Sequence, residues 1–199
     1  MKIFLFRHGQ TDYNVKGLIQ GMTDIELNEV GLKQAEINAN FLKDFGIQHI
    51  YTSPLKRAYL TGKILADKIN VELEILDDLL PLDNGIAEGK PYSFKKEILG
   101  KENCKKFISC NEEGLDIVFP GGKSRRDLRN RLKNAINYIC KNDKYNVVAI
   151  STHGDNLKEL LFLYNFDDLS SIKNCEVIEA KYDKIAGFEV VKRIDINKF

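Results

Sequence analysis

Four residues of this sequence have side chains suited to phosphoryl chemistry: His8, His153, Arg7 and Arg57. An imidazole can attack phosphorus and form a covalent intermediate. Two guanidiniums offer forked N–H donors that match phosphate oxygens, and a protonated second imidazole would add another donor. Because no group of residues here resembles a metal site, we expect the arginines to stabilise charge in place of Mg²⁺.

Glycine follows two of the three histidines, at Gly9 and Gly154. A glycine lets the backbone approach a bound anion with no Cβ between them. The third histidine, His49, begins an expected strand without a polar companion, and we interpret it as structural or exposed. A single histidine or arginine in a sequence does not indicate a functional site. The prediction therefore depends on several such residues lying together at one place.

Alternating strands and helices are expected to bring these residues together. Short apolar or alternating runs predict strands, and three- and four-residue spacing predicts helices. The pattern predicts an α/β fold, a three-layer α/β/α sandwich with a mostly parallel central sheet and a C-terminal hairpin. Ligands of such sheets bind beyond the carboxyl ends of the strands, where the four residues occur. The expected strands are 2–6, 49–52, 71–76, 147–150, 176–182 and 187–195, and the expected helices are 32–45, 53–69, two short ones within 92–111, 124–139 and 157–164.

Length and composition favour one ordinary globular domain over residues 1–199. A net charge of +1 gives no support for a nucleic-acid or membrane-surface partner. No apolar run is long enough to span a bilayer, and the start of the chain is too short and too soon interrupted by Arg7 to be a signal peptide. Four cysteines without CxxC pairing indicate reduced thiols and a cytoplasmic protein. The sequence leaves open whether the chain forms a homodimer.

Five blocks of the sequence, in one order, resemble the histidine phosphatase superfamily, which has an Arg-His-Gly motif and includes cofactor-dependent phosphoglycerate mutases. The first block is Leu5-Phe6-Arg7-His8-Gly9-Gln10-Thr11, followed by Asn14. The resemblance covers residues 1 to about 180. The other four blocks lie at 21–35, 53–61, 120–124 and 151–154.

This resemblance implies a role for each matching residue. His8 would be the nucleophile that becomes phosphohistidine, and water would then hydrolyse it. Arg7, Arg57 and His153 would hold the phosphoryl group, with Asn14 at its rim. Ser53 and Thr61 also match motif positions, and we interpret them as capping or packing residues.

The sequence departs from the family at the residue that protonates the leaving alcohol. The family has a glutamate four residues before the glycine of its middle motif, and that position here is Pro81. Asp83 is the nearest carboxyl group and our first candidate for the general acid, with Glu88 as the second. Alternatively, Asp83 is a turn residue that accepts from its own backbone, as Asp often does near Asn-Gly.

Two further departures concern charge. Lys123 stands where the family commonly has glutamate, which would make the rim of the site more basic. Asp155 follows the second histidine motif, where it would cap the next helix. Residues 77–120 are expected to cover the pocket as an insertion, although a helix and core packing is the alternative. Candidate wall residues in this segment are Tyr92, Phe94, Lys95 and Lys96.

The predicted function is therefore a metal-independent phosphatase, a histidine acid-type phosphomonoesterase that acts on a small phosphorylated metabolite without a cofactor. One alternative is phosphoglycerate mutase-type transfer of the phosphoryl group to another hydroxyl. The short 90–119 segment and Pro81 favour hydrolysis over it. The other alternative is a catalytically weak, phosphate-binding regulatory protein.

Overall fold

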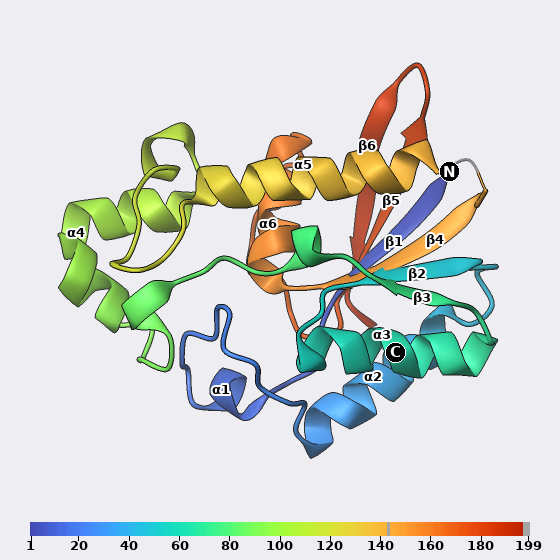
Figure 1. Ribbon diagram of the computed structural model, residues 1–199, viewed down its shortest axis with the longest axis horizontal. Coiled ribbons are helices and arrows are strands. Elements are labelled where there is room, and N and C mark those ends of the chain that lie inside the picture. Colours follow the sequence, from blue (N-terminus) through green and yellow to red (C-terminus); the bar gives the residue numbers. More distant parts are fainter. Residues whose placement is uncertain (143, 197–199) are drawn as a thin grey trace.

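A six-stranded sheet with helices on both faces forms the centre of the computed structural model, which describes residues 1–142 and 144–196 (Figure 1). The first four strands along the chain are parallel to one another, whereas β5 runs antiparallel to β1, and β6 to β5. This arrangement confirms the predicted α/β/α sandwich with a C-terminal hairpin. In order across the sheet, the strands are β3 (Leu73–Ile75), β2 (His49–Thr52), β4 (Val147–Thr152), β1 (Lys2–Arg7), β5 (Val177–Asp183) and β6 (Gly187–Ile194).

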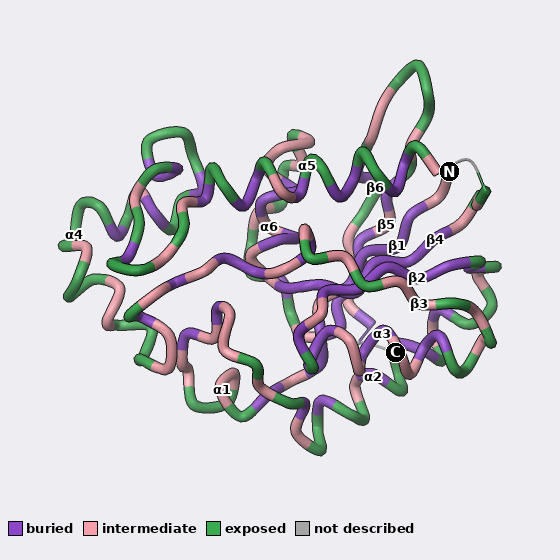
Figure 2. Tube along the Cα trace, viewed as in Figure 1, coloured by how far each residue is buried: buried purple, intermediate pink, exposed green. Residues whose placement is uncertain are grey.

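Alternate residues of β1 contribute to two separate cores, because successive side chains of a strand point to opposite faces. Ile3 and Leu5 pack with α5 (Arg125–Lys141) and α6 (Gly154–Leu163). Phe4 and Phe6 pack with α2 (Glu29–Leu42) and α3 (Lys56–Ile69) on the other face. The central strands are therefore buried on both faces, as Figure 2 shows.

One predicted helix start is confirmed and another is wrong. Ser124 caps α5 in a capping box with Asp127, whose N–H donates to the Ser124 hydroxyl at 3.0 Å. Ser53 does not cap α3, because the N-cap is Leu55 and no side chain of the helix start caps it. Instead, the side chain of Asp24 accepts from the Lys56 N–H at 2.8 Å. The Ser53 hydroxyl is thus available to a different partner.

Irregular segments and short helices gather beyond the carboxyl ends of the parallel strands (Figure 1). Gly100, with φ 75° and ψ 164°, divides α4 into two pieces, which accounts for the two short helical patterns predicted there. No helix of the described residues has the length and apolar character needed to cross a membrane. The helices that lie beyond the carboxyl ends of the strands are α1 (Asp12–Val15), η1 (Asp77–Leu79), η2 (Gly85–Ala87), α4 (Phe94–Ser109) and η3 (Glu112–Gly114).

A buried ion cluster joins α5 to α6 and to the α4 region. The carboxylate of Glu159, which is fully buried, accepts from Arg125 at 2.5 Å and from Arg129 at 2.6 Å. The Arg125 guanidinium also lies over the ring of Phe107 in α4, 4.6 Å from its centroid. The cluster therefore holds α4 beside the start of α6.

We expect Glu159→Gln to lower the free energy of unfolding by about 3 kcal/mol, because two buried guanidiniums would lose their shared counter-charge. Glu112→Gln is the matched control, since Glu112 also pairs with Arg129 but its side chain is 71% exposed. That change should cost no more than about 1 kcal/mol. Urea unfolding of both variants measures the difference, and equal losses would contradict the expectation.

Candidate active site

A cavity of about 280 Å³ lies where the ends of β1 and β4 meet the start of α6. Arg7 and Thr152 are partners in the parallel register, so His8 and His153 follow directly on adjacent strand ends. The centroids of the two imidazole rings are 5.4 Å apart. Of the predicted site residues, the cavity wall contains Arg7, His8, Arg57, His153 and Gly154.

His8 is held in the tautomer that a nucleophile needs. Its Nδ1 lies 2.7 Å from the carbonyl oxygen of Gly9. A carbonyl oxygen only accepts, so Nδ1 carries the proton and Nε2 has the lone pair. Burial, together with the charges of Arg7 and Arg57, lowers the pKa of His8 well below its usual range. The imidazole is therefore neutral at neutral pH.

His153 is oriented by Ser53, a contact that sequence analysis did not predict. Its Nε2 lies 2.8 Å from the Ser53 hydroxyl, and its buried Nδ1 has no partner among the described residues. Burial, followed by the charges of Arg57 and His8, lowers the pKa of His153 well below its usual range. The expectation that this ring is protonated is therefore wrong at neutral pH.

Both arginines are tied to backbone carbonyls through their terminal nitrogens. Arg57 donates to the oxygens of Thr23 at 2.8 Å and Gly21 at 2.7 Å, and Arg7 donates to that of Ile172 at 2.6 Å. The buried Nε of each arginine has no partner among the described residues. Burial lowers the pKa of Arg57 to about 10, which leaves it charged at neutral pH.

Three buried nitrogens at the cavity thus lack a hydrogen-bond partner: Arg7 Nε, Arg57 Nε and His153 Nδ1. Buried donors in folded proteins are normally paired, because an unpaired one loses its hydrogen bond to water without compensation. A tetrahedral oxyanion beside His8 could accept from both arginines, and from His153 when the Ser53 hydroxyl donates to Nε2 and Nδ1 carries the proton. Within the described part of the chain, no cluster of His, Cys, Asp and Glu is arranged to hold a metal ion.

The two glycines that follow the histidines differ in their surroundings. A Cβ on Gly154 would lie 3.4 Å from the Arg7 side chain, which is an ordinary van der Waals contact, so Gly154 lines the cavity without being required there by close packing. Gly9 is not among the described wall residues. A Cβ there would overlap the carbonyl oxygen of Gly31, so Gly9 permits close packing of the chain onto α2 instead of backbone contact with an anion.

Asp83, the first candidate for the general acid, lies in a turn outside the described wall of the cavity. Its carboxylate accepts from the N–H of Gly85 at 3.0 Å, as in the alternative interpretation given above. Lys123 is joined to the same turn, because its N–H donates to the Asp83 carbonyl oxygen at 3.0 Å. The Lys123 residue is exposed and is not part of the described wall either, so the structure places neither residue at the cavity.

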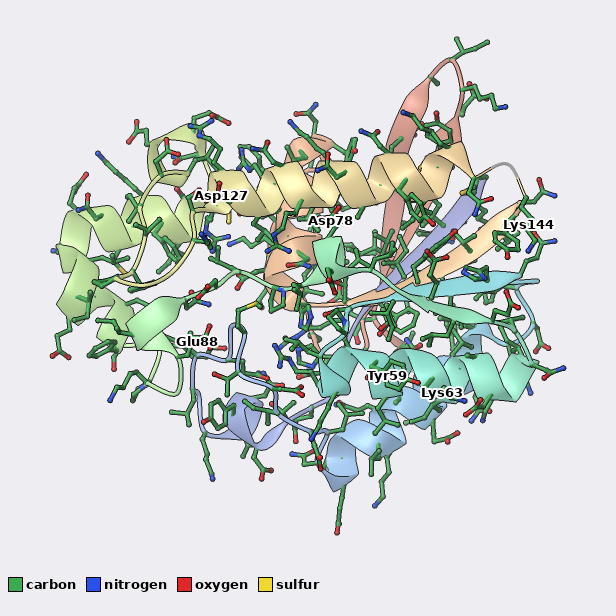
Figure 3. All side chains as sticks on the ribbon, viewed as in Figure 1. Tyr59, Lys63, Asp78, Glu88, Asp127 and Lys144 are labelled. Atoms are coloured by element: carbon green, nitrogen blue, oxygen red, sulfur yellow. The ribbon has the colours of Figure 1, made fainter. Side chains whose placement is uncertain are left out.

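Glu88, the second candidate, holds the loop that follows α1 (Figure 3). Its carboxylate accepts from the N–H of Met22 at 2.7 Å, the N–H of Thr23 at 2.8 Å and the N–H of Asn84 at 3.1 Å. This loop presents the carbonyl oxygens that fix Arg57. Glu88 therefore supports the site from outside the described cavity wall.

Asn14 is likewise engaged outside the described wall of the cavity. Its side-chain oxygen accepts from the N–H of Thr11 at 3.1 Å and from the amide of Asn174 at 3.2 Å. The first bond belongs to the capping box of α1. The geometry thus gives Asn14 a role in holding the loop after His8.

The cavity wall also contains residues that sequence analysis passed over and two that it named as wall candidates. Lys158 was not predicted, although its position three residues after Asp155 places both on one side of α6. Tyr92 and Lys95 do line the cavity. Of the other two candidates in this segment, Phe94 packs against the core and Lys96 is exposed.

We expect the rings of His8 and His153 to stay neutral as the pH falls through 6.5, the ordinary pKa of histidine. A lowered pKa means that the neutral form persists below that pH, because burial and the arginines disfavour an imidazolium. Two-bond ¹H–¹⁵N spectra can follow all three histidines, with His49→Gln as the assignment control. A measured pKa of 6.5 or higher for either ring would contradict this expectation.

Several known proteins are similar to this chain. The profile of the histidine phosphatase superfamily (branch 1) matches residues 3–192. "Uncharacterized phosphatase PhoE" of Bacillus subtilis (strain 168) is 32% identical over 159 residues, which cover 80% of this chain and 75% of that protein. "Phosphoserine phosphatase 1" of Hydrogenobacter thermophilus is 32% identical over 155 residues, covering 77% and 71%. The crystal structure of phosphoglycerate mutase from Bacillus anthracis str. Sterne shares the fold, with a TM-score of 0.89, 22% identity and coverage of 99% and 94%.

Proposed function

Because the chain belongs to branch 1 of the histidine phosphatase superfamily, we propose that it hydrolyses small phosphomonoesters through a phosphohistidine at His8. One observation carries the proposal: Arg7, Arg57 and His153 each have a buried nitrogen without a partner among the described residues, and they line one cavity with a neutral imidazole whose Nδ1 is bonded to Gly9. Four cationic side chains and one carboxylate line the cavity, which favours an anionic substrate.

In the first step, the phosphate oxygens would accept from Arg7, Arg57 and His153 while Nε2 of His8 attacks phosphorus. The bond between phosphorus and the ester oxygen breaks, and its electron pair stays with the leaving oxygen. The Nδ1–H bond to Gly9 stabilises the positive charge that develops on the His8 ring. In the second step, water attacks phosphorus, the P–N bond breaks, and inorganic phosphate leaves.

Segment 77–120 supplies four wall residues of the cavity: Pro81, Asn84, Tyr92 and Lys95. None of these four residues is assigned to the phosphoryl oxygens. We propose that this segment selects the remainder of the substrate, a small phosphorylated metabolite. We also propose, from the sequence, a single domain and a cytoplasmic location.

The proposal is tested with p-nitrophenyl phosphate and a panel of phosphorylated metabolites, with His8→Ala as the reference. We expect inorganic phosphate to be released by the wild-type enzyme well above that variant. Phosphorus NMR of the same reactions distinguishes hydrolysis from transfer to a second hydroxyl, which would indicate a mutase. Phosphate binding without any turnover would instead indicate the regulatory alternative.

A further inference from the structure

We infer that Asp155 is the proton-transfer residue of this reaction: it protonates the leaving oxygen and then deprotonates the attacking water. The inference rests on the proposed function and deepens it. Asp155 is the one carboxylate among the described residues that line the cavity. The family's glutamate position holds Pro81, which also lines the cavity and has no proton to give.

The two carboxylates nearest to Pro81 in sequence are committed to other contacts. Asp83 closes a turn through Gly85, and Glu88 accepts from three backbone N–H groups and from the Thr23 hydroxyl at 2.6 Å. Both groups also lie outside the described wall of the cavity. Neither group is therefore suited to carry a proton to a substrate in the cavity.

The position of Asp155 on α6 places it beside the phosphoryl-binding groups. It is the second residue of the helix and follows Gly154, which packs against the Arg7 side chain. Its own side chain is 37% exposed, so water can reach it. Asp155 therefore shares the cavity wall with Arg7 and is open to the solvent that must supply the second nucleophile.

Both steps balance with one carboxyl group. As the P–Nε2 bond forms and the ester bond breaks, the acid form of Asp155 gives its proton to the leaving oxygen and becomes a carboxylate. That carboxylate then takes a proton from water as the water oxygen attacks phosphorus and the P–N bond breaks. Inorganic phosphate leaves, and both His8 and Asp155 return to their starting forms.

The surroundings of Asp155 determine its pH dependence. Arg125 lies 3.5 Å from the Asp155 carboxylate. The other cationic neighbours of Asp155 are Lys95, Lys158 and Arg7. Tyr92, which lies just before α4, also interacts electrostatically with the Asp155 carboxylate. Partial removal from water raises the pKa of Asp155, but these cations outweigh that effect and hold it below its usual range. The acid form therefore accumulates only at acidic pH, and a bound phosphate dianion shifts the balance towards it. Hydrolysis of alkyl phosphates, which needs the acid form, should rise as the pH falls.

The decisive experiment compares leaving groups in Asp155→Asn, which keeps the size of the side chain. We expect kcat/KM for an alkyl phosphate such as glycerol 2-phosphate to fall about 10²-fold. For p-nitrophenyl phosphate, whose leaving group needs little protonation, the fall should be less than about 10-fold. Asp83→Asn is the control and should leave the ratio between the two substrates unchanged.

A second arm uses charge to separate proton transfer from a merely structural role. Removing a cation in Lys158→Met should raise the pKa of Asp155 and shift the alkyl phosphate profile to higher pH. Lys123→Met removes an exposed lysine outside the described cavity wall and should leave the profile unchanged. In the Asp155→Asn background, Lys158→Met should no longer move the profile.

The outcomes distinguish this inference from the proposed function. If Asp155→Asn slows both ester classes equally, or if Asp83→Asn changes their ratio, Asp155 is not the proton donor, although phosphatase activity through His8 stands. If the wild-type enzyme releases no more phosphate than His8→Ala from either ester, the proposed function itself fails.

Discussion

His8→Ala should lower kcat for p-nitrophenyl phosphate by about 10⁴-fold or more, as expected when a covalent nucleophile is removed. The neutral ring is bonded through Nδ1 to Gly9, so only Nε2 has a lone pair to offer. Phosphate release at saturating substrate measures the loss. An alkaline quench with labelled substrate should trap a phosphoenzyme in the wild type and none in the variant.

His49→Gln is the matched control for this experiment. His49 is buried in β2, where it stacks on Tyr145 with ring centroids 4.6 Å apart and lies 3.3 Å from the carboxylate of Glu74. These contacts are structural, so the change should leave kcat within about twofold while lowering stability. Labelling of His8→Ala at His153 would contradict the assignment of the nucleophile.

The second large effect is expected for Arg57→Lys, which should lower kcat/KM about 10³-fold. The guanidinium is fixed by the carbonyl oxygens of Gly21 and Thr23, which leaves Nε for the substrate. A lysine ammonium keeps the charge but lacks the planar fork, so it cannot make these bonds together. Competition by inorganic phosphate should weaken in parallel, because the same donor binds substrate and product.

Arg126→Lys is the control for loss of a guanidinium alone. Arg126 is exposed on α5, where it donates to Asp116 at 2.8 and 2.9 Å, and it is not among the described wall residues. Its replacement should leave kcat/KM and phosphate inhibition unchanged. Thermal unfolding of both variants reports damage to the fold. A loss below tenfold in a well-folded Arg57→Lys protein would contradict the assigned role.

The convergence of His8 and His153 could be predicted because it follows from local rules. Apolar runs mark strands that are buried on both faces, and such strands run parallel in an α/β sheet. Residues directly after two such strands then share one edge of the sheet, as the register between Arg7 and Thr152 confirms. The start of α5 could also be predicted from the sequence, because Ser124 and Asp127, three residues apart, have the spacing of a capping box.

The roles of the carboxylates could not be predicted in this way. Proximity in sequence to the family's glutamate position favoured Asp83, yet the carboxylate of Asp83 accepts from the Gly85 N–H two residues on. Sequence analysis interpreted Asp155 as a helix cap. In the structure it lines the cavity, because α6 begins beside Arg7. Its cationic neighbours Arg125 and Lys95 come from other elements of the fold. Likewise, Ser53 meets His153 across one hundred residues of chain.

The sequence by itself determined the α/β architecture and the family, and it predicted the nucleophile with its phosphate-binding partners, because strand and helix periodicity and local motifs act over a few residues. The tertiary structure alone decided that both cavity histidines are neutral, that Ser53 orients His153, and which carboxylate lines the cavity. Those properties depend on burial and on charges that distant segments bring together, and neither leaves a periodic signal in the chain.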